Sequence, residues 1–455
     1  MTKSFRTIAM MVFLFFMMSL SVQAKVSKEA ADKLEKELTP IGAEKAGNAD
    51  GTIPEWTGGY KDIPEGFVEF ENEPDPFKND PILFTITPQN LGQYKGKLTP
   101  GQIAMFESYP DTYKMNIYQT RRTACYPQYV YDAVKRNAVN AETNETDYSL
   151  NNFEVFCPFP IPKTGLEVLW NYICGYLSPT GAYTIINGQA IMNRDGQFTL
   201  SRIEDAVLRP FNAEGTKPDK ILSYFKQRTI APPRLAGNLL LVYENIDIFR
   251  NPRQAFLYNS GQRRIRRAPS VAYDAPGTAS DGLTTADDYA MYNGSPDKYS
   301  IKLIGKREIY IPYNCRQTID RSLSYKDILT PYHINPDYIR YELHRVWVIE
   351  MDLKENERHI YKKRVYYFDE DSYSIVIGEK YDKRDQLWRV SQNHVYHLYQ
   401  IPMMLSIGLI THCDLQSRRY LAFRLVNEEK ELPSFRVKMT SDDFTPSTLS
   451  RWGIR

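Results

Sequence analysis

Strand-like segments joined by short polar links occupy most of the second half of this sequence. These segments are rich in Tyr, Val and Ile, residues that favour pleated, half-buried surfaces. They cover residues 237–247, 255–258, 301–304, 308–312, 341–354, 361–368, 373–378, 387–397 and 420–426. Links such as 368–372 and 379–383 are too short for a crossover connection, so the strands that they join must be antiparallel. The sequence therefore predicts a large antiparallel sheet.

The first half of the chain contains fewer strand signals. Helical spacing and capping residues predict helices over 27–38, 100–109 and 161–176, and residues 183–200 alternate like a strand. Residues 42–88 are rich in Gly, Pro, Asp and Asn, which predicts an irregular segment on the surface of the main body. The longest interruption of the strand series, 270–298, is too long for a hairpin turn and is predicted to cross the sheet or its rim.

The N-terminus has the pattern of a cleavable secretory signal peptide. Lys3 and Arg6 precede an apolar run over 8–20, and Val22-Gln23-Ala24 places small residues at the −3 and −1 positions of a cut before Lys25. The apolar run is shorter than the ~20 residues that cross a hydrocarbon core. The sequence therefore predicts export, with the signal peptide at 1–24 and no transmembrane span in the mature chain.

Charge and cysteine content exclude several classes of protein. The chain has 57 basic and 55 acidic residues, and removing Lys3 and Arg6 with the signal peptide leaves 55 of each. A mature chain of zero formal net charge has no global attraction to nucleic acid. The five cysteines form no C-x-x-C pair, which argues against a zinc ribbon or a redox site. One or two disulfides are compatible with export, but buried free thiols are the favoured interpretation.

No local motif indicates catalysis, so the sequence predicts a protein that is not an enzyme and has neither cofactor nor metal. H-E-x-x-H, G-x-S-x-G, P-loop and dinucleotide-binding patterns are absent. Asp369, Glu370 and Asp371 lie in a predicted turn, where solvated charge is the expectation. A hydrolase that uses a carboxylate pair assembled by the fold is the lowest-ranked alternative.

Two arginine groups stand out. Arg121 and Arg122 lie between tyrosines, and four arginines fall within 263–267. On an extended strand Arg264 and Arg266 share one face. Cations this close repel one another, so each group needs either acidic neighbours within the protein, which is the favoured interpretation, or an anionic ligand.

An ordered series of motifs resembles one family of exported Gram-negative proteins of unassigned function. The motifs are LTPIGAEKAGN (38–48), GTIPEWTGG (51–59), YQTRRTA (118–124), PFPIP (158–162) and GQRRIRRAP (261–269). The resemblance covers nearly the whole mature chain. The family is grouped with the outer-membrane lipoprotein-sorting (LolA/LolB-like) superfamily, although this chain is longer than a minimal carrier and lacks a lipoprotein cysteine.

The resemblance implies a mostly β fold with α-helices. It is an open antiparallel β half-barrel whose concave side is covered by helices over an apolar cavity. We expect an N-terminal helix and irregular extension over 25–110 and the half-barrel domain over 111–455. The implied function is a periplasmic carrier or chaperone for a lipid, an acylated protein or another apolar cargo. The alternative is an envelope adaptor that docks on a transporter or outer-membrane protein through a sheet edge or through the segment 270–298.

Candidate site residues follow from this hypothesis. Aromatic residues on the central strands and on the covering helix are candidates for the cargo contacts, although packing within the core is the commoner role for such residues. They are Trp170, Tyr243, Tyr258, Trp347, Tyr366 and Trp388. Arg121, Arg122, Arg264 and Arg266 are candidates for a headgroup or gate site.

Overall fold

The computed structural model describes residues 26–68, 73–248, 250–268 and 273–452. The predicted signal peptide at 1–24 and its cleavage position lie outside this range. Within the described range, no helix combines the length and the apolar character needed to cross a membrane.

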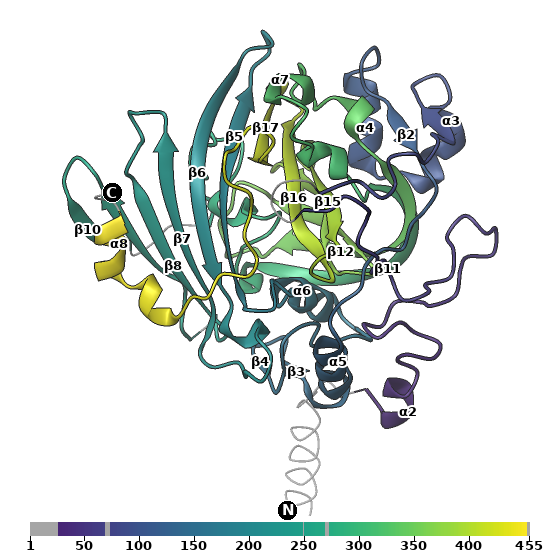
Figure 1. Cartoon of the computed structure of the whole chain (residues 1–455), viewed down its shortest axis with the longest axis horizontal. Helices are drawn as coiled ribbons and strands as arrows, with labels where there is room; N and C mark the ends of the chain where they lie inside the picture. The colour runs from purple at the N-terminus through teal and green to yellow at the C-terminus, as the bar shows by residue number, and fades with distance from the viewer. Residues whose placement is uncertain (1–25, 69–72, 249, 269–272, 453–455) are drawn as a thin grey trace, which may run out of the picture.

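One open sheet of fifteen strands dominates the molecule (Figure 1). Its strands are β1 (Phe84–Ile86), β2 (Met115–Ile117), β5 (Ala182–Met192), β6 (Phe198–Leu208), β7 (Ile221–Ala231), β8 (Leu239–Asn245), β9 (Gln254–Asn259), β10 (Arg264–Ala268), β11 (Tyr299–Pro312), β12 (Tyr341–Leu353), β13 (Lys363–Asp369), β14 (Ile375–Tyr381), β15 (Leu387–Leu398), β16 (Met403–Asp414) and β17 (Arg419–Leu425). A separate small hairpin pairs β3 (Glu142–Thr143) with β4 (Leu150–Asn151).

The strand order is β1-β2-β12-β13-β14-β15-β16-β17-β5-β6-β7-β8-β9-β10, with β11 paired to β12. Nearly every neighbour pair is antiparallel; the exception is a single parallel contact between Tyr341 of β12 and Ile117 of β2. The sheet curves but does not close, and this confirms the predicted mostly β, open half-barrel fold. Both faces of β12 are buried at its centre, where Val346 and Val348 alternate with Ile349 and Met351, as the sequence predicts.

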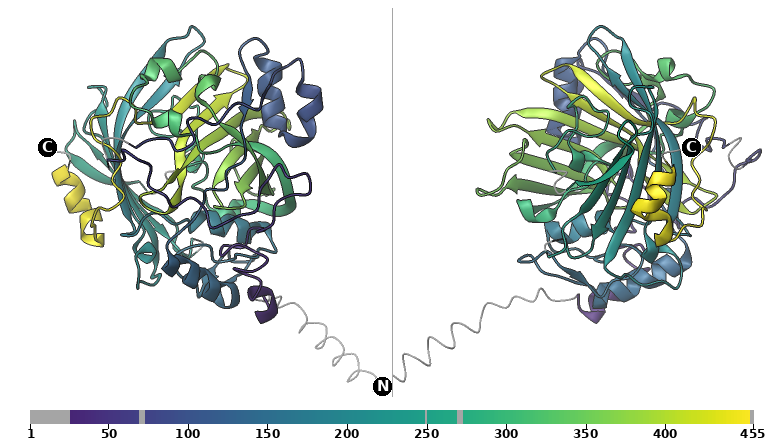
Figure 2. Two further views of the ribbon diagram at one scale, coloured as in Figure 1. Left: turned by 45° about the vertical axis from the view of Figure 1, so that its right-hand side comes forward. Right: turned by 90° about the vertical axis from the view of Figure 1, so that its left-hand side faces the viewer.

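Helices cover both faces of the sheet. We call inner the face on which α6 (Gly165–Ile173) packs, against Ile349, Phe368 and other residues of β12–β17. The outer face of β6–β10 carries α8 (Pro446–Trp452), which Figure 2 shows outside these strands. The outer face of β15–β17 is covered by α4 (Pro100–Ser108) and α7 (Tyr325–Ile328).

The remaining helices are short or lie at the lower end of the molecule in Figure 1. They are α2 (Lys28–Ala31), α3 (Leu91–Tyr94) and α5 (Gln128–Asn140), with 3-10 turns η1 (Lys95–Lys97), η2 (Pro210–Asn212), η3 (Ala286–Asp288), η4 (Pro296–Lys298), η5 (Arg316–Ile319), η6 (Pro336–Tyr338) and η7 (Ser441–Phe444). The sequence-based prediction located α4 and α6 but missed α5.

Three predicted boundaries are wrong. The helix expected over 27–38 is only the four-residue α2, because Glu35 has a left-handed φ of 70° that a helix does not allow. The strand expected over 183–200 is the hairpin β5–β6, which turns at 193–197. The strands expected at 301–304 and 308–312 are one strand, β11, with a bulge at Gly305, whose φ of 122° suits glycine.

The cysteines are buried free thiols, as the sequence favours. All five are free and buried. They act as small apolar side chains, which confirms that interpretation.

Candidate functional site

The inner face of the half-barrel is filled by the protein's own side chains. Met291 and Tyr292, from the segment 273–298, pack with Val168, Leu169 and Tyr172 of α6 against β12–β17. A cavity of about 90 Å³, which we call the inner cavity, remains between α6, residues 289–294 and β5–β8. Sites for small molecules usually have ~300–1,000 Å³. The hypothesis of a large apolar hollow on this face is therefore not met in this conformation.

Buried ion pairs hold the segment 273–298 on the inner face. Asp288 contacts Lys380 Nζ at 3.0 Å, and Asp287 contacts Arg364 Nη2 at 2.7 Å. Tyr361 donates a further hydrogen bond to Asp288 at 2.9 Å. Burial alone would raise the pKa of Asp288, but the charges of Lys380 and Arg364 outweigh it and hold that pKa well below its usual range. The segment predicted to cross the sheet does so in the interior.

A serine, a lysine and a histidine meet beneath this segment. Ser391 Oγ lies 2.7 Å from both Lys380 Nζ and His412 Nδ1. Such neighbours can activate a serine for nucleophilic attack. Here the three side chains are at most 3% exposed and lie under Asp288. Burial, together with Lys380, lowers the pKa of His412 to about 3. We therefore interpret this cluster as part of the buried polar network.

The acidic turn 369–371 is buried, and the expectation that its charges are solvated is wrong. The N-terminal extension covers it, because Glu44 N donates to Glu370; Lys306 of β11 also pairs with the Glu370 carboxylate, at 2.9 Å. Arg122 donates to both oxygens of Asp371, at 2.7 and 2.8 Å. Sequence reasoning could not see this cover, because its residues are distant along the chain.

The same turn contributes two of the three donors that come nearest to a metal site in the described chain. His344, Asp369 and Asp371 offer ligand atoms within 4.8 Å of one another. Imidazole and carboxylate ligands would suit a zinc-like ion. However, Arg122 already takes both Asp371 oxygens and supplies a positive charge there. The cluster is therefore accounted for as an ion-pair network.

A larger pocket lies where two neighbouring strands of the sheet separate. β17 pairs with β5 only over Gly188–Met192, and lower on β5 a single bridge joins Thr184 to Ser434. A pocket of about 790 Å³ lies at this seam, between residues 73–78, 316–323, 396–400 and 426–435. We call it the seam pocket. Its volume falls within the range of small-molecule sites.

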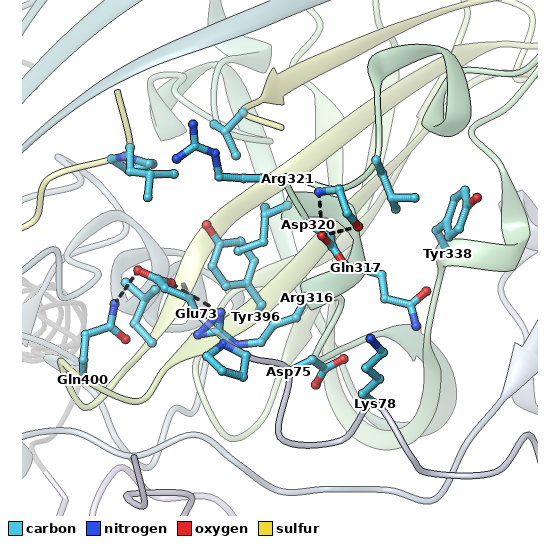
Figure 3. A pocket seen from close by; sticks show the side chains of 18 of the residues that line it. Glu73, Asp75, Lys78, Arg316, Gln317, Asp320, Arg321, Tyr338, Tyr396 and Gln400 are labelled. Atoms are coloured by element: carbon cyan, nitrogen blue, oxygen red, sulfur yellow. Dashed lines mark hydrogen bonds and ion pairs between the residues drawn. The ribbon is translucent and has the colours of Figure 1, made fainter. Parts of the chain in front are cut away.

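The seam pocket combines an apolar wall with charged groups (Figure 3). Its apolar side chains include Ile319, Leu323, Tyr396, Leu398, Val426, Leu432, Pro433 and Phe435. In Figure 3, Glu73 lies between Gln400, whose amide nitrogen is 3.2 Å away, and Arg316, at 3.5 Å. The Arg316 guanidinium stacks over Tyr399, 4.3 Å from the ring centre. Burial raises the pKa of Asp75, which also lines the pocket.

A thin aromatic wall separates the seam pocket from the inner cavity. Phe435 lines the seam pocket, Tyr183 lines the inner cavity, and their ring centres are 5.7 Å apart. Both belong to one apolar cluster that also contains Tyr396 and Val207. This ring pair is therefore a direct contact between the linings of the two spaces.

The six aromatic cargo candidates are divided between different parts of the structure. Trp347 and Tyr366 lie on the inner face, packed in the cluster that contains α6. Tyr243 and Tyr258 lie on the outer face beneath α8, where Tyr243 donates to Phe444 O at 2.6 Å.

The remaining two lie elsewhere. Trp170 of α6 is fully buried in a separate cluster, and Trp388 packs against Tyr361. The six side chains do not converge on one cavity, and their contact with a cargo stays a prediction.

The four arginine candidates also differ in their surroundings. Arg122 is buried against Asp371, and Arg121 pairs with Asp80 at 2.7 Å. Arg264 and Arg266 are exposed on β10, the last strand of the sheet. Within the part of the chain that the structure describes, no carboxylate lies within 4.0 Å of either. Pairing within the protein therefore accounts for the first group only, and a headgroup or gate role stays a prediction.

Asp205, on the inner face, is expected to make stability depend on pH. Burial raises its pKa to about 6, and the hydrogen bond from Gln227, at 2.9 Å, the charge of Arg424 and the hydrogen bond from Asn187 only partly oppose this. Since the unfolded value is ~3.9, the folded state binds the proton more tightly. The resulting stabilisation is present at pH 4 and is lost as the pH rises towards 6, by about 2 kcal/mol.

Urea unfolding of the wild type and of Asp205→Asn from pH 4 to pH 7 would measure this contribution. We expect the difference between their free energies of unfolding to change by about 2 kcal/mol over that range. A difference that stays constant would show that Asp205 does not titrate there.

The comparisons with known proteins cover most of the chain. Residues 85–450 match the DUF1329 family, described as proteins of unknown function. An uncharacterised protein of Pseudomonas aeruginosa is 47% identical over 447 residues, covering 96% of each chain.

Three solved structures are similar at low sequence identity. A Vibrio parahaemolyticus domain described as an outer membrane lipoprotein-sorting protein is 14% identical, with a TM-score of 0.44 over 63% of this chain and 98% of that one. A DUF1329 family protein of Desulfovibrio piger is 13% identical, with a TM-score of 0.41 over 59% and 92%. A LolA superfamily protein of Nitrosomonas europaea is 13% identical, with a TM-score of 0.38 over 63% and 100%.

Proposed function

The chain belongs to the DUF1329 family, and we propose that it is a periplasmic binding protein that carries a hydrophobic or amphipathic molecule in the seam pocket towards the outer membrane. The observation that supports this most directly is the seam pocket itself, about 790 Å³ in volume with an apolar wall and charged groups beside it. Binding without catalysis agrees with the absence of a catalytic motif in the sequence. The N-terminal signal pattern supports export.

The size of the hydrophobic effect makes such a carrier useful. Each CH₂ group removed from water gains ~0.8 kcal/mol, so a chain of about ten carbons gains on the order of 8 kcal/mol before the costs of binding. A free apolar chain crosses an aqueous compartment slowly, whereas a protein pocket offsets the cost of its exposure. The seam pocket is already formed, so binding there requires no displacement of the segment 273–298.

Titration of the mature chain with N-phenyl-1-naphthylamine, an uncharged apolar fluorophore, would test this proposal. We expect saturable fluorescence enhancement by the wild type. Leu432→Arg places a charge on a half-buried residue of the pocket wall and is expected to weaken binding at least tenfold, or ~1.4 kcal/mol. Ile304→Arg, at an exposed position of β11, is the matched control and should bind as the wild type does.

A wild type that does not bind the fluorophore, or a Leu432→Arg variant that binds it unchanged, would contradict the proposal. Either result would favour the second candidate function, an envelope adaptor. One observation supports that candidate: β10 ends the sheet with exposed arginines, and Leu257 of its neighbour β9 is 46% exposed. Residues 283–298 are buried or half-buried and less suited to docking, whereas Pro276, Thr278, Asp281 and Gly282 of the same segment are exposed.

A further inference from the structure

Among the described residues, Arg424 is a buried cation that has no carboxylate in ion-pair contact. Lys380, Arg364, Arg389 and Arg122 are buried, and each contacts an aspartate within about 3 Å. Arg424 of β17 is 3% exposed, yet no carboxylate within the described chain lies within 4.0 Å of it. Its guanidinium instead lies 5.1 Å from the ring centre of Tyr183. Asp205 interacts with Arg424 electrostatically but makes no ion-pair contact, and a buried cation without such a contact needs an explanation.

The free donors of Arg424 are on one edge of the guanidinium. Nη1 donates to Ile407 O at 2.7 Å. Nε and Nη2 are buried and have no hydrogen-bond partner among the described residues. These two N–H groups point in parallel, and their spacing matches two oxygens of a carboxylate, phosphate or sulfate. The unpaired edge is therefore a fork for an oxyanion.

The backbone directs this side chain inwards. The register between β17 and β5 shifts between Phe423 and Leu425, so Arg424 is the extra residue of a β-bulge. Its φ is +70°, a left-handed value that is uncommon for a residue other than glycine. Bulges change the direction in which a side chain points, and they occur often beside functional sites. Here the bulge turns Arg424 towards the inner face, at the point where the two strands stop pairing.

Arg424 lies next to both spaces described above. Tyr183, over which it stacks, lines the inner cavity, and Tyr183 in turn contacts Phe435 of the seam pocket. Ile407, whose carbonyl accepts its one hydrogen bond, also lines the inner cavity. Val426, two residues further along the chain, lines the seam pocket. The guanidinium is therefore placed behind the aromatic wall between the two spaces.

We propose that Arg424 binds the acidic group of the cargo, so that the cargo is an amphiphile with a carboxylate, phosphate or sulfate at one end of an apolar chain. This inference rests on the proposed function, because the apolar chain would occupy the seam pocket. The acidic group reaches Arg424 where Tyr183 and Phe435 meet. Asp205 interacts electrostatically with Arg424, but it takes its hydrogen bonds from Gln227 and Asn187 and leaves the Nε–Nη2 edge of Arg424 unpaired.

Displacement of N-phenyl-1-naphthylamine by dodecanoate, 1-dodecanol and inorganic phosphate would test this. We expect the wild type to bind dodecanoate at least tenfold more tightly than dodecanol. Arg424→Gln should remove this preference and leave the affinity for dodecanol within twofold, whereas Arg424→Lys should keep part of it. Arg384→Gln, at an arginine whose side chain is 69% exposed and that does not line the pocket, is the matched control and should keep the full preference.

The outcomes separate the two proposals. If the wild type binds neither alkyl compound, the proposed function fails. If it binds both equally, or if Arg424→Gln keeps the full preference, Arg424 is not the anion site and the proposed function stands. If phosphate competes through Arg424 and binds as tightly as dodecanoate, the oxyanion site is supported. Its ligand is then a free anion rather than the acidic group of an amphiphile.

A thermal measurement excludes a merely structural role for Arg424. Arg424 makes no ion-pair contact within 4.0 Å among the described residues and interacts with Asp205 only beyond that distance, so its replacement should cost the ligand-free protein little stability. We therefore expect Arg424→Gln to unfold at the wild-type temperature or above it. A clearly lower unfolding temperature would show that Arg424 supports the fold itself and would overturn the assignment.

Discussion

Lys380→Met is expected to lower the free energy of unfolding by about 3–5 kcal/mol, because it removes one partner of a fully buried ion pair. Lys380 Nζ lies 3.0 Å from Asp288 and 2.7 Å from Ser391 Oγ, and the side chains of both Lys380 and Asp288 are 0% exposed. Water cannot replace the lost ammonium there. Tyr361 would still donate to Asp288, so the carboxylate would retain only part of its stabilisation. Urea unfolding followed by tyrosine and tryptophan fluorescence would measure the loss.

Lys302→Met provides the control for this variant. Lys302 Nζ lies 3.0 Å from Asp352, the same distance as in the buried pair, but its side chain is 58% exposed. Exposed ion pairs contribute ~0–1 kcal/mol, so the control should lose no more than that. Equal losses in the two variants would show that burial does not set the strength of the inner network.

The strength of this network decides where a cargo can bind. Opening the inner face would break the contacts of Asp287 and Asp288 with Arg364 and Lys380, all of them buried. A ligand would have to supply that free energy in addition to its own costs of binding. The seam pocket imposes no such cost, because it is open in the same structure. A strong effect of Lys380→Met would therefore favour the seam pocket over the inner face as the cargo site.

The sheet was largely predictable from the sequence, because alternation and short links act locally. β12, β15 and β17 were expected almost at their observed bounds. β16 and β7 were missed. β16 is a nearly continuous apolar run with Gly408 in its interior, and the strand signal of β7 is interrupted by Lys226 and Arg228. Burial on both faces removes the period-two pattern on which a strand prediction depends.

The candidate site was not predictable, because the fold assembles it from distant segments. The seam pocket uses residues near 75, 320, 398 and 430, and none of these segments has a motif of its own. Arg424 did leave a signal, since a single arginine within the apolar run Leu421-Ala422-Phe423-Arg424-Leu425 is unusual for a strand at the centre of a sheet. The turn 369–371 misled the prediction, because only the folded chain shows that Glu44 and Arg122 cover it.

Arg122→Gln is the second change with a large expected effect. Arg122 donates to both Asp371 oxygens and also to Glu44 O at 2.7 Å and Lys45 O at 3.1 Å, so it ties the N-terminal extension to the sheet. Its loss leaves Asp371 buried beside two other carboxylates. We expect the free energy of unfolding to fall by about 3–5 kcal/mol. Cleavage by a protease near residues 44–54 should become faster as the extension detaches.

Arg121→Gln separates this structural role from the predicted gate role. Arg121 is 37% exposed at its side chain, and its partner Asp80 keeps a second cation, Arg340, at 2.8 Å. Its loss should therefore cost no more than about 1 kcal/mol. If Arg122 instead gated a ligand, Arg122→Gln would change fluorophore binding while its stability and protease resistance stayed at the wild-type level. The ion pair with Asp371 at 2.7 Å argues for the structural result, since a guanidinium held at both oxygens has little freedom to move.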